Sequence, residues 1–212
     1  MIKLIACDID GTLINDGTKT QREEKPSPEA IQMIKDLKSA GYTFCIVNTG
    51  GNHVDLTDDY AAVPAEMKAV AAHFGKPVLR EVTAEQVISA IPALREKVGD
   101  RAILRALHFF AENDRVAEQK SALKSGDLAK YFSGVLASGR SSYCYLQNVY
   151  TTKNVSEQGL SLALAITDSV MSGKGGAFRV HGGGFAGTIQ AFVPFSLVEK
   201  YRSAIDSAFG RG

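Results

Sequence analysis

The sequence predicts an α+β protein in which a small, mostly antiparallel sheet is flanked by helices. Two observations support this fold class. Short apolar runs typical of buried strands lie near both ends of the chain, at 2–9, 42–50 and 176–194. The stretch between the second and third runs shows helical spacing of apolar residues instead. A chain of 212 residues is long enough for one domain or two small ones, and it contains no internal repeat or long linker.

The first elements follow in order from the N-terminus. The run "IKLIACDI" (2–9) is a predicted strand, and the polar stretch 15–28 is a predicted loop. A helix is expected over 27–41, because Ser27 is a suitable cap and Gly41 a suitable end. Aromatic and β-branched residues in 42–50 then predict a second strand.

The remaining elements are mainly helical. Apolar spacing and terminal glycines predict helices over 56–76, 83–99, 100–126, 127–139 and 155–173, with Pro92 interrupting the second of them. Two strands joined by a glycine-rich turn follow in 176–194. A last helix is expected over 196–209.

Composition excludes some classes of function. Lys and Arg number 24 against 23 Asp and Glu, which gives no support to binding of nucleic acid or of a charged membrane surface. The three cysteines lie far apart and favour reduced thiols over disulfides. Neither a signal peptide nor an apolar run of transmembrane length is evident, so a cytoplasmic protein is expected.

A pair of carboxylates follows the first predicted strand. In "CDIDGTL", Asp8 and Asp10 stand two residues apart, and strand alternation places both on one face. Such a pair can hold Mg²⁺ through oxygen ligands, while one carboxylate attacks phosphorus and the other handles the proton of the leaving group. The stretch resembles the first motif of the haloacid dehalogenase (HAD) superfamily, which implies Asp8 as nucleophile and Asp10 as acid/base.

The same resemblance extends to Thr49, which stands at the end of the second strand where this superfamily places a hydroxyl that binds the transferring phosphoryl group. The later lysine and acidic pair that would complete a magnesium site are not found at suitable spacing. The Gly-Asp pairs at 99–100 and 126–127 are more simply explained as helix caps.

From about residue 37 the chain resembles the C-terminal half of galactokinases, members of the GHMP small-molecule kinase family. The segments that carry the resemblance are "IVNTGGNHVDLTDDYAAVPAEM", "RALHFFAENDRV", "SGRSSYCYLQNVY" and "RVHGGGFAGTIQAFVP". The resemblance implies a GHMP C-terminal fold with a ferredoxin-like antiparallel sheet, to which the N-terminal strand–loop–helix is added. It places a boundary between a HAD-like segment (1–36) and a galactokinase-like domain (37–212).

Two features of this second resemblance point to binding. Gly182, Gly183, Gly184 and Gly187 allow positive φ and close backbone approach, which suits a turn that cradles phosphate oxygens. The resemblance implies that this loop supports a nucleotide-binding loop and that Tyr60 contacts the sugar. It also implies galactose, ATP and Mg²⁺ as ligands.

The sequence leaves three functions open. The first is ATP-dependent phosphorylation of galactose at its anomeric hydroxyl, with the expectation that the chain alone is inactive, because the ATP loop and catalytic aspartate of galactokinases are not found in it. The second is a Mg²⁺-dependent HAD phosphohydrolase that uses Asp8. The third is a non-enzymatic domain that self-associates through an apolar surface where the other half would dock.

Overall fold

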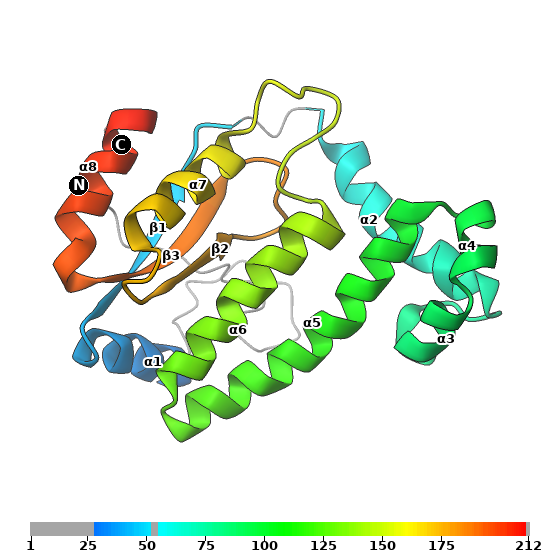
Figure 1. Cartoon of the computed structure of the whole chain (residues 1–212), viewed down its shortest axis with the longest axis horizontal. Helices are drawn as coiled ribbons and strands as arrows, with labels where there is room; N and C mark the ends of the chain where they lie inside the picture. Colours follow the sequence, from blue (N-terminus) through cyan, green and yellow to red (C-terminus); the bar gives the residue numbers. More distant parts are fainter. Residues whose placement is uncertain (1–27, 52–54, 211–212) are drawn as a thin grey trace. The chain divides into compact units, whose positions relative to one another are not determined.

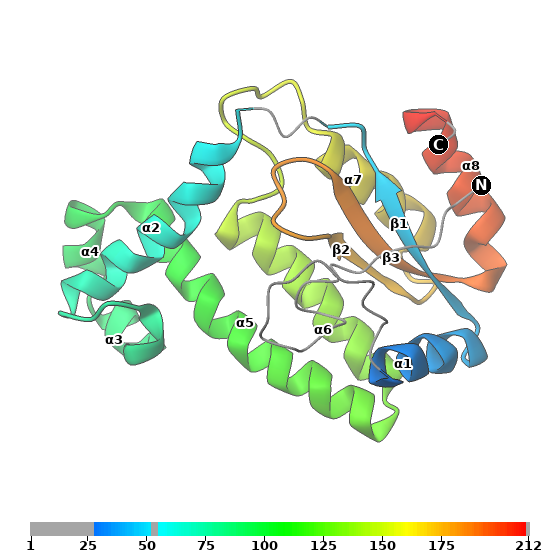
Figure 2. The same ribbon diagram turned by 180° about the vertical axis from the view of Figure 1, so that it is seen from behind.

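The computed structural model describes residues 28–51 and 55–210. The predicted strand 2–9, with Asp8 and Asp10, lies outside the described residues. The described chain forms two compact units (Figures 1 and 2), the first from residues up to Gly51 together with Gly159 onward and the second from the residues between them. Among the described helices, none combines the length and apolar composition needed to cross a bilayer.

The first unit is built on a three-stranded antiparallel sheet with the order β1-β3-β2. Its elements are α1 (Pro28–Ser39), β1 (Tyr42–Asn48), α7 (Gly159–Met171), β2 (Ala177–Val180), β3 (Thr188–Pro194), η4 (Phe195–Leu197) and α8 (Val198–Phe209). The α+β class and the antiparallel sheet are therefore confirmed. The ferredoxin-like arrangement and the boundary near residue 36 remain predictions.

One face of this sheet is buried beneath α7 and α8, which lie side by side in Figures 1 and 2. Cys45 and Val47 of β1 stand opposite Ala191 and Ile189 of β3, and all four side chains are buried. This is the alternation expected for a strand with one covered face. Above them, the buried Tyr201 hydroxyl of α8 lies 3.1 Å from the Thr167 hydroxyl of α7.

The second unit is helical. It consists of α2 (Thr57–His73), η2 (Leu79–Glu81), α3 (Ala84–Ser89), α4 (Ile91–Lys97), α5 (Asp100–Ser125), α6 (Leu128–Ser141) and the short π-helix η3 (Ser142–Leu146). The core of this unit joins α2, η2, α3 and α4 to the first half of α5. Gly134 of α6 allows a close approach to α5, since a Cβ there would lie 2.6 Å from the Gln119 side chain.

Candidate functional site

The glycine-rich loop of the first unit joins β2 to β3. The His181 amide donates to the Thr188 carbonyl at 3.0 Å and closes the turn. Gly182, Gly184 and Gly187 have positive φ, as the sequence predicts, whereas Gly183 does not. Phe185 also has a positive φ of 59° and is buried, so a bulky side chain is held in a backbone region that it normally avoids. Backbone strain of this kind is concentrated at functional sites, and the sequence did not predict it.

Thr49 connects this loop to the end of β1. Its amide and its hydroxyl both donate to the Gly187 carbonyl, at 2.9 and 2.8 Å. The start of α7 lies against the same side chain, because a Cβ on Gly159 would approach the Thr49 Cβ and Oγ1 to 3.1 Å. The structure thus brings together Thr49, the glycine loop and the N-terminus of α7. The Thr49 hydroxyl donates its only proton to the Gly187 carbonyl. This hydrogen bond ties the loop to the end of β1, so Thr49 positions the loop.

The backbone of the loop is accessible at Gly182. A Cβ on Gly182 would meet nothing within 4 Å, so the backbone there is open to an approaching ligand. In many proteins, phosphate oxygens are held by backbone amides of turns in which successive residues alternate between negative and positive φ, and by the N-terminus of a helix. The glycine loop and the adjacent start of α7 are therefore the candidate phosphate site among the described residues.

A second polar site lies in the other unit, at the start of α2. The Lys153 ammonium donates to the Asp58 carboxylate at 2.9 Å and to the Asp55 carbonyl at 3.3 Å. The Thr151 hydroxyl donates to the Asp59 carboxylate at 3.0 Å. Asp55 itself has a φ of 68°. These contacts fasten the segment after η3 to the first turn of α2.

Tyr60 is the next residue of that first turn and is half-buried. Burial raises the pKa of its phenol, and the neighbouring Asp59 carboxylate raises it further. The phenol therefore stays protonated at and above neutral pH.

α5 contains a buried arginine, Arg105. The Arg105 side chain is only 2% exposed, and its guanidinium donates to the Glu66 carboxylate of α2 at 2.9 Å and to the Leu146 carbonyl of η3 at 3.1 Å. Glu66 also accepts from Arg101 at 3.0 Å. Desolvation lowers the pKa of Arg105, while the Glu66 charge opposes this effect. Sequence reasoning missed this network, because an arginine within a long helix has the appearance of a surface residue.

The carboxylates expected to hold a metal, Asp8 and Asp10, lie outside the described residues. Within residues 28–51 and 55–210, no three His, Cys, Asp or Glu side chains gather as a metal site requires. The acidic pair Asp58-Asp59 is engaged with Lys153 and Thr151.

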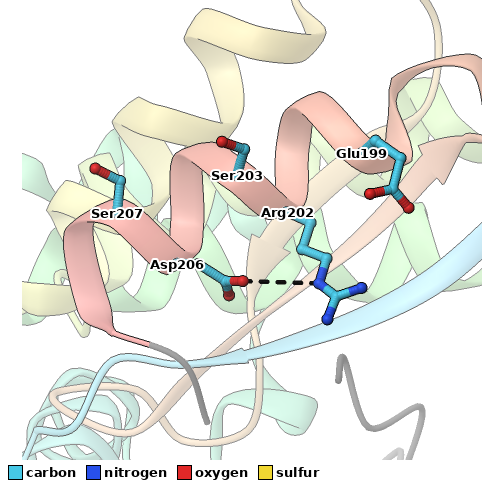
Figure 3. Close-up of a pocket in the computed structure, with 5 residues that line it drawn as sticks. All are labelled: Glu199, Arg202, Ser203, Asp206 and Ser207. Carbon is cyan, nitrogen blue, oxygen red and sulfur yellow. Dashed lines mark ion pairs between the residues drawn. The ribbon is translucent and has the colours of Figure 1, made fainter.

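A hollow of about 540 Å³ lies beside α8 (Figure 3). The described residues that line it all belong to this one helix, namely Glu199, Arg202, Ser203, Asp206 and Ser207. Arg202 and Asp206 form an ion pair with an N–O distance of 3.6 Å, one helical turn apart. This charge-balanced surface is typical of the solvent-facing side of an amphipathic helix, and we assign it no function.

Comparison with known proteins finds two similarities that overlap along the chain. A family model for haloacid dehalogenase-like hydrolases matches residues 5–101. The chain is also 34% identical over 165 residues to a galactokinase of Actinobacillus pleuropneumoniae serotype 5b (strain L20) and 35% identical over 165 residues to one of Glaesserella parasuis serovar 5. Each of these alignments covers 78% of the chain but only 41% of the relative, so the chain spans about two fifths of the length of these enzymes.

A solved structure shares the fold. The galactokinase of Lactococcus lactis, determined in complex with galactose, matches 80% of this chain and 42% of its own, with a TM-score of 0.61 and 22% sequence identity. The galactokinase-like fold and the galactokinase-like sequence are thus both present over about four fifths of the chain. The N-terminal part, at the same time, is HAD-like.

Proposed function

We propose that this chain contributes to ATP- and Mg²⁺-dependent phosphorylation of galactose at its anomeric hydroxyl, as galactokinases do. The observation that carries the proposal is the galactokinase-like sequence over 78% of the chain. In this proposal Tyr60 contacts the sugar, and the loop over 182–187 supports the phosphates of ATP. Thr49 positions that loop by holding the Gly187 carbonyl.

Galactose binding tests this proposal without requiring turnover. Isothermal titration calorimetry with D-galactose should give saturable binding that Tyr60→Ala weakens by at least about tenfold, or ~1.4 kcal/mol. Tyr145→Ala is a matched control, because Tyr145 is an exposed tyrosine of η3 in the same unit. Equal affinities for the wild type and both variants would remove Tyr60 from the sugar site, and absence of binding would contradict the proposal.

The expectation that this chain alone does not transfer phosphoryl groups stays a prediction. Phosphoryl transfer depends on positioning and on charge stabilisation of the transferring group, and the described residues supply only part of that arrangement. Incubation with galactose, ATP and Mg²⁺ should therefore leave galactose unchanged. Accumulation of galactose 1-phosphate in a ³¹P NMR spectrum would show that the chain is active alone.

A second function is favoured by the family match over residues 5–101. In this alternative the chain is a Mg²⁺-dependent phosphohydrolase with Asp8 as nucleophile and Asp10 as acid/base. This alternative requires a later acidic pair to complete the magnesium site. The described strands after β1 do not support it, because β2 and β3 end at Val180 and Pro194 and no acidic residue directly follows either end.

A phosphatase assay with p-nitrophenyl phosphate and Mg²⁺ tests the second function. Hydrolysis that is abolished by Asp8→Asn and retained by Asp58→Asn would establish it. Asp58 suits the control because its exposed carboxylate is engaged with Lys153 at the start of α2. Hydrolysis that is absent, or unchanged in Asp8→Asn, would exclude it.

Self-association also stays a prediction. Light scattering over a range of concentrations measures the molar mass directly. A mass that rises with concentration would support association, and a constant monomer mass would contradict it.

A further inference from the structure

A groove on the second unit has features of a ligand site that the proposed function does not use. It lies between α5 and the segment from η2 to the start of α3, and its volume is about 350 Å³. This volume falls within the range of about 300–1,000 Å³ that is usual for small-molecule sites. The described residues that line the groove all lie between positions 79 and 114, within the second unit.

The floor and one wall of the groove are apolar. Leu79 and Val82 are 3% and 6% exposed and belong to the hydrophobic core of this unit. Phe109 and Phe110 of α5 pack against the same core and remain partly exposed along the groove. Their rings meet nearly edge to face, with centroids 5.5 Å apart. An apolar ligand group on this floor would displace water from the exposed parts of Phe109 and Phe110.

Two opposite charges stand at the rim. The Arg80 guanidinium lies over the Phe109 ring, 5.9 Å from its centroid, and a stacked guanidinium keeps its N–H groups available for a carboxylate. Asp114 lines the groove from α5, five residues beyond Phe109 and so roughly 7.5 Å further along the helix axis. In the described part of the chain, neither Arg80 nor Asp114 takes part in an ion pair.

Asn113 also lines the groove. Its side-chain amide donates to the Phe109 carbonyl one turn earlier, at 2.7 Å. This hydrogen bond holds the amide close to the helix, so that the cation and the anion are the strongest polar groups at the rim. The groove therefore presents an apolar floor, a cation on one side and an anion on the other.

From this arrangement we infer that the groove binds a small zwitterion that carries an apolar side chain. The carboxylate of the ligand meets Arg80, its ammonium group meets Asp114, and its side chain lies against Phe109 and Phe110. A free apolar amino acid and an apolar dipeptide share this chemistry, and they differ in the distance between their charges.

Titration calorimetry with L-phenylalanine and with L-phenylalanyl-L-leucine tests the inference and separates the two sources. Saturable binding is expected for at least one of them, and the tighter ligand identifies the charge separation that the groove accepts. N-acetyl-L-phenylalanine amide, which has the same ring and no charge, should bind at least about tenfold more weakly, as expected if charge complementarity contributes about 1.4 kcal/mol.

Three variants assign the binding to the groove. Arg80→Gln and Asp114→Asn should each weaken the binding by at least about tenfold. Arg95→Gln should leave it unchanged, because Arg95 is an exposed arginine of the same unit that pairs with Asp100 and does not line the groove. Circular dichroism checks that each variant is folded. Absence of saturable binding for both zwitterions, or binding that is insensitive to both groove substitutions, would overturn the inference.

Discussion

At the scale of single residues, burial decides which polar groups stabilise the fold. Arg105 illustrates this most directly, because its guanidinium is withdrawn from water and bonded to groups from two other segments. Such a group stabilises the fold only while its partners are present. Loss of Arg105 would leave the Leu146 carbonyl without this hydrogen bond and Glu66 with Arg101 as its remaining cation.

Arg105→Ala should therefore lower the free energy of unfolding by about 3 kcal/mol, through the lost ion pair with Glu66 and the unsatisfied Leu146 carbonyl. Arg95→Ala is the control, since its pair with Asp100 is exposed and solvent screening leaves it little effect on stability. Urea denaturation measures both values. A loss for Arg105→Ala no larger than that of the control would show that the buried network is not a source of stability.

The Cys45 thiol links stability to alkaline pH. Burial raises its pKa to about 11, from an ordinary value of 9.0. Between these values an unfolded chain loses the proton while the folded chain retains it. Stability is thus unaffected by this group below pH 9 and falls by about 1.4 kcal/mol per pH unit up to pH 11. In urea denaturation at pH 8 and pH 10.5, the wild type should lose about 2 kcal/mol more stability than Cys45→Ala. Equal losses in the two proteins would contradict this assignment.

At the scale of elements, the boundaries that could be predicted are those with a local chemical cause. The helix over 100–126 ends as Gly126 adopts a left-handed conformation, and Asp127 caps the next helix by accepting from the Lys130 amide. Thr83 forms a capping box with Gln86 at the start of α3. These signals lie within a few residues of the element that they delimit, and sequence patterns report them directly.

The features that could not be predicted depend on distant residues. Nothing in "SYCYL" indicates that α6 continues into a π-helix. The last residue of this π-helix, Leu146, accepts a hydrogen bond from the Arg105 guanidinium of α5 at its carbonyl. The contact between Gly159 and Thr49 depends likewise on packing between segments far apart in the chain. The glycine loop could be predicted from its composition, but its attachment to Thr49 could not.

Gly176 provides a test of element packing. It has a φ of +84°, and a Cβ there would lie 2.2 Å from the Phe192 carbonyl oxygen. Gly176→Ala should therefore displace the start of β2 from β3 and cost more than about 3 kcal/mol, through both the backbone conformation and the steric clash. Gly173→Ala is a matched control, because its φ is +72° but no atom lies within 4 Å of the added Cβ, so that a cost of about 1 kcal/mol is expected. Thermal unfolding of both variants makes the comparison, and similar costs would contradict the packing argument.

At the scale of the whole molecule, galactokinase-like and HAD-like sequence overlap in one chain. The HAD-like match ends at residue 101, within the first turn of α5, while the galactokinase-like similarity covers 78% of the chain. The described residues include the glycine loop, Thr49 and Tyr60. They do not include Asp8 or Asp10.

The central claim is that galactose is bound at the start of α2. Chemical-shift mapping on ¹⁵N-labelled protein titrated with D-galactose tests it most directly, because the amide signals report where the sugar lies. We predict saturable shifts concentrated at Tyr60 and the neighbouring residues of the first turn of α2. An unchanged spectrum, or shifts confined to other parts of the chain, would contradict the claim.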